Sequence, residues 1–204
     1  DGSGGTAEIC TRVRMALLAC GQGRPEIAVE RLNRLRVRGE RTVEGQWIAP
    51  VAEAAAELSL WHGRPADARE EILAAFRRLP TDEPAYISRI GVLFALGMRA
   101  EGDLAEIASA RHATDSLAES GVIAQRHLGQ IRALRDMAIA GFPAFVREAE
   151  AWLAVCGAEF ARVEGGSEPA SWAAAAEAFG AIPMAYPRAY ALWRCGEAVR
   201  ASPR

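Results

Sequence analysis

The chain has 204 residues, half of them hydrophobic and a quarter charged, with a formal net charge of −2 at pH 7. This apolar content is too high for a disordered chain, and the length suffices for a substantial core. The near-neutral net charge does not favour binding to the phosphates of a nucleic acid. No apolar run reaches the roughly 18 residues that a membrane span requires. No signal peptide is visible, so we expect a cytoplasmic protein that binds neither nucleic acid nor membrane directly.

The first part of the chain is expected to form four helices. Apolar residues recur there at three- and four-residue spacing, which places them on one face of a helix. Pro50 falls in the first turn of the third helix, where a missing N–H group costs little, and Pro80 ends the fourth. Residues 39–45, with two glycines and several charges, are typical of a loop. The expected helices span residues 6–20, 25–38, 46–62 and 65–79.

The rest of the chain is expected to form six more helices. One begins near Pro84 and ends before Gly97, and two are separated near Gly121, although their pairing stays open. Pro143 opens a helix that Gly165 and the residues after it end. The expected ranges are 84–96, 104–119, 122–140, 143–164, 169–179 and 187–201. About ten helices and no strand predict an all-α fold.

A ten-residue phrase occurs twice, forty residues apart, at 23–32 and at 63–72. Each copy places a glycine where a helix can end in a left-handed residue, then a proline that can open the next helix, then an alanine suited to close contact. Stacked helix–turn–helix units have this signature. Such arrays usually bind or transmit signals, so the repeat favours an interaction domain over an enzyme.

The second copy resembles the 34-residue tetratricopeptide repeat. It carries the expected residue class at six positions: Ala56, Gly63, Ala68, Ile72, Ala75 and Pro80. The first copy has Glu40 in place of the proline, but it matches the pattern at five positions: Ala16, Gly23, Ala28, Leu32 and Leu35. A third unit, starting at Glu83, has the turn glycine, Gly97, but carries Gly102 where the pattern has alanine. The resemblance implies a tetratricopeptide-like solenoid of about ten antiparallel helices. Residues 1–5 are expected to form a flexible leader to a single domain, 6–204, with units at 9–42, 49–82 and 83–116, less regular helices at 117–164 and a terminal pair at 169–201.

Two phrases near the C-terminal end, 172–180 and 186–198, resemble a recurrent segment of LuxR-type bacterial transcriptional regulators of the MalT-like, signal-transduction ATPase class. Members of that class carry a nucleotide-binding module, a helical-repeat region and a DNA-binding helix-turn-helix. This chain has no lysine, hence no phosphate-binding loop, and it ends without DNA-reading helices. The resemblance implies a sensing region that relays effector or partner binding to domains absent from the chain. A tetratricopeptide scaffold for protein assembly, unrelated to transcription, is the alternative.

The tetratricopeptide resemblance also identifies candidate binding residues, since three positions of each inner helix line the concave groove of that family. They correspond here to Glu53, Glu57 and Trp61 in the second unit, and to Val13 and Leu17 in the first. The two carboxylates are four residues apart and share a helical face with Trp61. They would suit a basic or amine-bearing group of a protein segment or small effector. Alternatively, the acids only keep an exposed face hydrated and the tryptophan is a packing anchor.

No motif predicts catalysis, a cofactor or a metal. The histidines, His62, His112 and His127, have no metal-ligand spacing, and His62 is placed to cap the end of its helix. No nucleophile motif occurs. The four cysteines, Cys10, Cys20, Cys156 and Cys195, are expected to be small buried hydrophobes. The arginine-rich run at 31–41 is interleaved with glutamates, which favours a solvated face or a contact with another domain.

Overall fold

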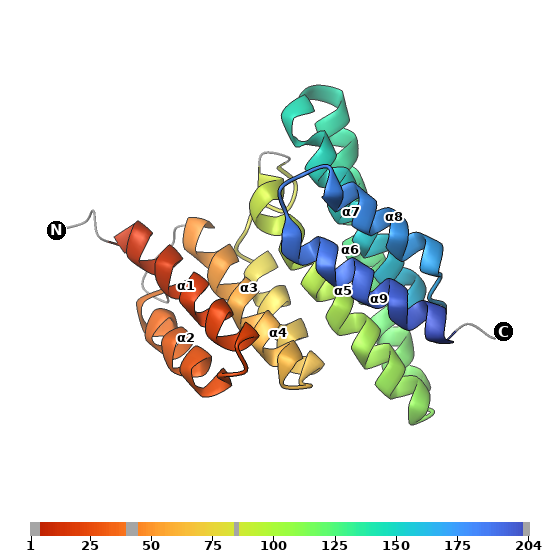
Figure 1. Ribbon diagram of the computed structural model, residues 1–204, viewed down its shortest axis with the longest axis horizontal. Helices are drawn as coiled ribbons and strands as arrows, with labels where there is room; N and C mark the ends of the chain where they lie inside the picture. Colours follow the sequence, from red (N-terminus) through yellow and green to blue (C-terminus); the bar gives the residue numbers. More distant parts are fainter. Residues whose placement is uncertain (1–4, 40–44, 84–85, 202–204) are drawn as a thin grey trace. The chain divides into compact units, whose positions relative to one another are not determined.

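The computed structural model describes residues 5–39, 45–83 and 86–201, and within these ranges the chain is helical without any strand (Figure 1). The prediction of an all-α fold is therefore confirmed. None of these helices combines the length and the apolar character that crossing a membrane requires. The α-helices of the described ranges are α1 (Gly5–Gly21), α2 (Pro25–Gly39), α3 (Gly45–Trp61), α4 (Pro65–Phe76), α5 (Ile87–Ala110), α6 (Thr114–Gly141), α7 (Val146–Val163), α8 (Pro169–Gly180) and α9 (Ala185–Ala201).

The chain divides into two compact units, unit 1 (Asp1–Pro80) and unit 2 (Thr81–Arg204). The division falls close to the boundary predicted between the second and third repeats. The single domain over 6–204 and the regular solenoid stay predictions. The leader at 1–5 lies almost wholly outside the described residues, as do most of the loop at 39–45 and the position of Glu40.

The repeated phrase of unit 1 forms the same turn twice. Gly23 and Gly63 both adopt left-handed conformations, with φ of 69° and 65°. Each glycine N–H bonds the carbonyl three residues back, and each following arginine N–H bonds the carbonyl five residues back, at 2.9 to 3.0 Å. These are the two bonds of a Schellman cap, which satisfies the last carbonyls of the first helix. Pro25 and Pro65 then open the second helix, so the local sequence encodes the whole hairpin.

The core of unit 1 lies between these hairpins. Helix α1 packs against α2 and α3, and α3 packs against α2 and α4. The packing positions predicted for the second unit, Ala56, Ala68, Ile72 and Ala75, are all buried. A cluster of apolar side chains joins the first three helices: Val13, Ala16, Ala19, Cys20, Ala28, Leu32, Leu35, Trp47, Ala54 and Leu58.

Unit 2 differs from the sequence prediction in its first two helices. Helix α5 continues through Gly97 to Ala110, and α6 runs unbroken through Gly121, so the expected breaks at both glycines are wrong and two helices replace three. The turn lies instead at His112, whose φ of 55° is left-handed without being glycine. His112 and Ala113 make the same two capping bonds, to Ser109 and Ala108.

Two glycines inside α5 serve close packing. A Cβ atom at Gly91 would lie 2.2 Å from Cδ1 of Trp152, and one at Gly102 would lie 2.4 Å from Nη2 of Arg162. Both neighbours belong to α7, so these glycines let α5 and α7 approach closely. The sequence predicts helix breaks at Gly97 and Gly121, whereas at Gly91 and Gly102 glycine marks a helix contact.

The helices of unit 2 pack against one another in pairs. Helix α5 packs on α6 and α7, α7 also packs on α6 and α8, and α8 packs on α9. The rings of Trp152 and Phe179 meet edge to face with centroids 4.9 Å apart, joining α7 to α8. His127 is buried on α6 with its ring in a T-shaped contact with Phe94, and burial lowers its pKa to about 4, although a hydrogen bond that His127 donates to Gln130 acts in the opposite direction.

Candidate functional site

The candidate residues of unit 1 separate into core and surface. Val13 is buried and Leu17 packs against the same cluster, so the structure does not place them on an open groove. On α3, Glu53 is half-buried and Glu57 is buried, whereas 57% of Trp61 is exposed. The indole N–H of Trp61 donates to a carboxylate oxygen of Glu57 at 3.0 Å. We call Glu53, Glu57 and Trp61 the α3 surface.

The pKa of Glu53 on the α3 surface depends on burial and on two charged neighbours. Burial raises the pKa of Glu53; Arg14 of α1 opposes this shift and Glu57 adds to it. Glu57 already accepts the indole hydrogen, so the exposed aromatic face of Trp61 is the part of this surface that is open to a ligand. A cation over an indole face is attracted by the ring quadrupole. Binding of a basic group here stays a prediction.

The structure also describes several of the histidine, cysteine and arginine side chains for which the sequence made predictions. His62 caps its helix as expected, because Nδ1 lies 2.8 Å from the carbonyl of Leu58 and must donate to it. Cys20 and Cys156 are buried and Cys195 is partly exposed; the side chain of Cys10 lies outside the described residues. Of the arginine-rich run, Arg34 pairs with Glu30 on an exposed face of α2, and positions 36, 38 and 41 are not described at the side-chain level.

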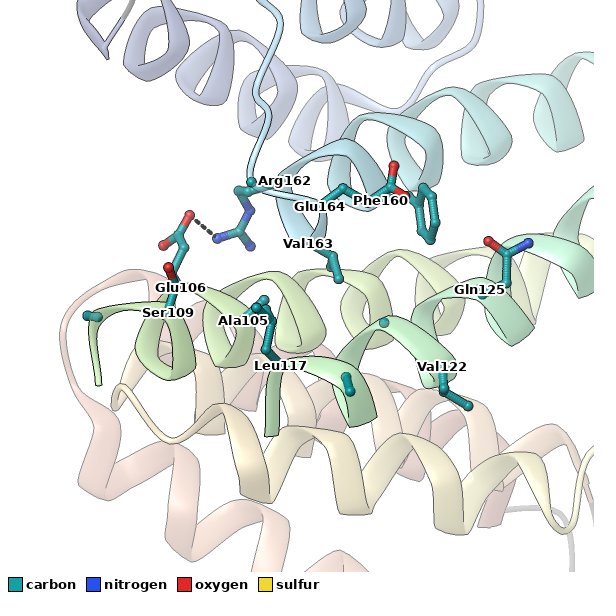
Figure 2. Close-up of a pocket in the computed structure, with 14 residues that line it drawn as sticks. Ala105, Glu106, Ser109, Leu117, Val122, Gln125, Phe160, Arg162, Val163 and Glu164 are labelled. Atoms are coloured by element: carbon teal, nitrogen blue, oxygen red, sulfur yellow. Dashed lines mark hydrogen bonds and ion pairs between the residues drawn. The ribbon is translucent and has the colours of Figure 1, made fainter. Parts of the chain in front are cut away.

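Unit 2 contains a hollow that the sequence did not predict. Helix α6 is ten residues longer than α7, so its first turns extend about 15 Å beyond the end of α7. The hollow, of about 1030 Å³, lies there and is bounded by the last turns of α5; we call it the α5–α6–α7 groove (Figure 2). Its lining is Ala105, Glu106, Ser109, Ala110, Leu117, Ala118, Gly121, Val122, Gln125, Phe160, Arg162, Val163, Glu164 and Gly165.

Most of the groove wall is apolar or small. Leu117 and Val122 of α6 line the groove together with Val163 and Phe160 at the end of α7. Val122 is 62% exposed. The alanines and Gly121 leave room for an occupant to approach the backbone. The groove can therefore hold a segment with an apolar face.

One end of the groove is formed by a buried guanidinium. Nη1 of Arg162 lies 2.8 Å from both Glu106 and Asp103, and Nε donates to Glu159 at 2.8 Å. Nη2 donates to the carbonyl of Arg99 at 3.0 Å. Arg162 and Glu159 are both buried, while the Glu106 side chain is 57% exposed. Three carboxylates thus approach one guanidinium, and Glu106 presents its charge to the groove.

The ion pairs continue from Arg162 to helix α9. Asp103 also pairs with Arg194, which bonds the Tyr190 hydroxyl and Glu197; that hydroxyl donates to Glu159. Burial would lower the pKa of Arg162, but Glu159 and the neighbouring acids outweigh it and raise that pKa. Burial, and then Glu159, raises the pKa of Tyr190 well above its usual value. At neutral pH Arg162 therefore stays charged and Tyr190 stays neutral, and their contacts fix the end of the groove.

The Arg162 end of the groove is already paired within the protein. Each of the three nitrogens of the Arg162 guanidinium contacts a protein oxygen. In the described part of the chain, no three residues among His, Cys, Asp and Glu come together as they would to hold a metal ion. The sequence did carry one signal of the groove, namely the exposed apolar residues at the start of α6. These exposed residues indicate a groove only because the preceding helix, α5, ends at Ala110.

Comparisons of this chain with protein-family models, with curated proteins and with solved structures found no match. The tetratricopeptide resemblance and the LuxR-type resemblance therefore rest on the sequence phrases alone.

Proposed function

We propose that this chain is a helical interaction module without enzymatic activity, and that the α5–α6–α7 groove binds its partner. One observation carries this proposal: an apolar groove of about 1030 Å³ ends at an exposed carboxylate held by a buried ion-pair network. Such a fixed polar group beside apolar walls orients a bound segment.

The chemistry of the groove favours an amphipathic helix with a basic residue. Leu117, Val122 and Val163 suit the apolar anchors of a helix, which recur every three or four residues. Glu106 and Glu164 at the rim are both acidic, and Arg162 between them is already paired with carboxylates. A lysine or arginine of the partner therefore fits this end, and an acidic residue would be repelled.

The proposed setting is a LuxR-type transcriptional regulator, in which this region would sense a partner or effector and relay its binding to nucleotide-binding and DNA-binding domains. The phrases at 172–180 and 186–198 support that setting, and the twin capped hairpins of unit 1 support a tetratricopeptide-like repeat. In the alternative, the same groove serves a scaffold for protein assembly. The full gene product separates the two: an upstream phosphate-binding loop and a downstream helix-turn-helix support the regulator, and their joint absence excludes it.

Groove binding can be tested with designed peptides. Three peptides of about 15 residues, long enough to form a helix when bound, would share one leucine stripe and differ only in flanking lysine, glutamine or glutamate. We expect the lysine peptide to bind at least about tenfold more tightly than the glutamate peptide, a difference of about 1.4 kcal/mol. Calorimetric titration measures both affinities directly.

Two variants locate the binding. Val122→Asp places a charge on the apolar wall and should weaken the lysine peptide by about tenfold or more. Ile139→Asp is the matched control, because Ile139 lies on the same helix, is 56% exposed and is not part of the groove. Equal loss in both variants, or no preference among the three peptides, would refute the groove as the binding site.

The α3 surface is proposed as a second contact for a basic group, through the open face of Trp61. Its test is independent, since Trp61→Ala should weaken an arginine- or lysine-bearing ligand and leave binding to the groove peptide unchanged. Loss of groove-peptide affinity in Trp61→Ala would contradict this assignment.

A further inference from the structure

Helix α9 turns polar side chains toward the protein interior and apolar side chains toward solvent, the reverse of a usual surface helix. Tyr190 and Arg194 point inward, into the ion-pair network, and Ala191 and Ala198 are buried beside them. The outward face is apolar: Leu192 is 53% exposed and Val199 is 59% exposed, with Tyr186 and Trp193 beside them. Soluble proteins seldom expose such a continuous apolar face without a partner for it.

The exposed residues have the spacing of a coiled-coil seam. Five exposed apolar or small residues, which we call the outer seam, follow each other at steps of four, three, four and three: Ala185, Ala189, Leu192, Gly196 and Val199. That alternation is the repeat that keeps one stripe facing a neighbouring helix over several turns. The seam therefore fits another helix lying nearly parallel or antiparallel to α9.

The side chains of the outer seam complement each other in an antiparallel pair of identical helices. With the two-fold axis level with Arg194, Leu192 of one copy faces Gly196 of the second, and Ala189 faces Val199. Each layer then joins a larger side chain to a small one. A parallel pair would oppose Gly196 to Gly196 and Ala189 to Ala189, leaving two layers unfilled.

The residues on either side of the outer seam also favour the antiparallel register. In the antiparallel pair, exposed Arg200 of one copy lies beside exposed Tyr186 of the second, and the Trp193 rings meet near the two-fold axis. A guanidinium on a tyrosine face and a pair of aromatic rings are both favourable contacts. In a parallel pair, residues 186, 193 and 200 of the two copies lie on opposite sides of the seam, so neither contact forms.

From this complementarity we propose that the outer seam of α9 binds a second copy of the chain as an antiparallel, two-fold symmetric helix pair. The proposal is independent of the groove and of its partner. Four layers make an interface smaller than the standard size, so the dissociation constant is expected between about 10 µM and 1 mM. Sedimentation velocity of the whole chain up to about 1 mM measures it; a monomer throughout that range overturns the proposal.

Two substitutions in the seam test its specificity. Leu192→Glu should raise the dissociation constant at least about tenfold. Leu18→Glu is the matched control, because Leu18 is 59% exposed on α1 and lies outside the seam. Gly196→Leu is the sharper test: a Cβ atom at Gly196 meets no atom within 4 Å in the single chain, yet leucine there would fill the space that Leu192 of the second copy needs.

The direction in which Gly196→Leu changes the dissociation constant distinguishes specific helix pairing from nonspecific hydrophobic association. We expect it to weaken the dimer about tenfold or more while raising the melting temperature of the monomer, since leucine favours helix over glycine. A stronger association would show that the exposed face is merely adhesive and would overturn the proposed register.

Cross-linking tests the orientation. The double variant Ala189→Cys/Val199→Cys should form disulfide-linked dimers on mild oxidation, because these positions face each other only in the antiparallel pair. Ala189→Cys alone should cross-link no more than the unaltered chain, whose own cysteines set the background. Efficient cross-linking of the single variant would indicate a parallel pair and contradict the assignment.

Discussion

Replacing Gly91 by alanine should destabilise unit 2 although alanine is the better helix former. The added methyl carbon would lie 2.2 to 2.6 Å from three atoms of the Trp152 ring. That ring is buried and held edge to face against Phe179, so it cannot turn away freely. Overpacking of this kind lowers the free energy of unfolding by up to about 3 kcal/mol. The higher helix propensity of alanine raises it by about 1 kcal/mol. The net loss is about 2 kcal/mol.

The matched control is Gly129→Ala on α6, where a Cβ atom meets nothing within 4 Å. That variant should gain about 0.5–1 kcal/mol from the same propensity difference. Urea unfolding followed by circular dichroism measures both free energies, and Gly91→Ala should also lower the melting temperature by roughly 6 °C for a unit of this size. If Gly91→Ala stabilised the chain as Gly129→Ala does, the close contact of α5 with α7 would be refuted.

Three further predictions concern single side chains. Trp61→Ala should cost about 1 kcal/mol in urea unfolding, less than the 3–5 kcal/mol of a core tryptophan, because most of Trp61 is exposed; a larger loss would place it in the core. His127 has a folded-state pKa of about 4, below its unfolded value near 6.5, so stability should fall by up to about 3 kcal/mol as pH drops from 6.5 to 4. His127→Leu should flatten that part of the pH–stability curve, and an unchanged slope would assign it to other groups. His112→Gly should raise stability by about 1 kcal/mol because it relieves a left-handed residue, whereas Gly63→Ala should lower it by a similar amount, both measured by thermal unfolding.

The candidate sites were predictable to different degrees. The exposure of Trp61 and its place beside Glu57 follow from the spacing of residues on one helix, and the structure agrees with both. Val13 and Leu17 were placed on the same groove, yet they pack into the core, because periodicity identifies an apolar face without showing which neighbour covers it. The α5–α6–α7 groove was not predictable, since it depends on where three helices end relative to each other.

The sequence by itself determined the helices of unit 1 and their turns. A glycine followed by arginine and proline specifies a cap and a new helix through bonds between residues at most five apart, so no tertiary contact is needed to recognise it. The same local information predicted α8 and α9 to within two residues at each end.

Only the tertiary structure decided what the glycines of unit 2 do. Gly91 and Gly102 lie inside α5 because Trp152 and Arg162 of α7 occupy the space where a side chain would be, and that opposing surface is sixty residues away in the sequence. The turn at His112 lacks glycine, so nothing local identifies it. The network of Arg162 likewise joins α5, α7 and α9, and its charges are stable in the interior only because all three helices bring their partners together.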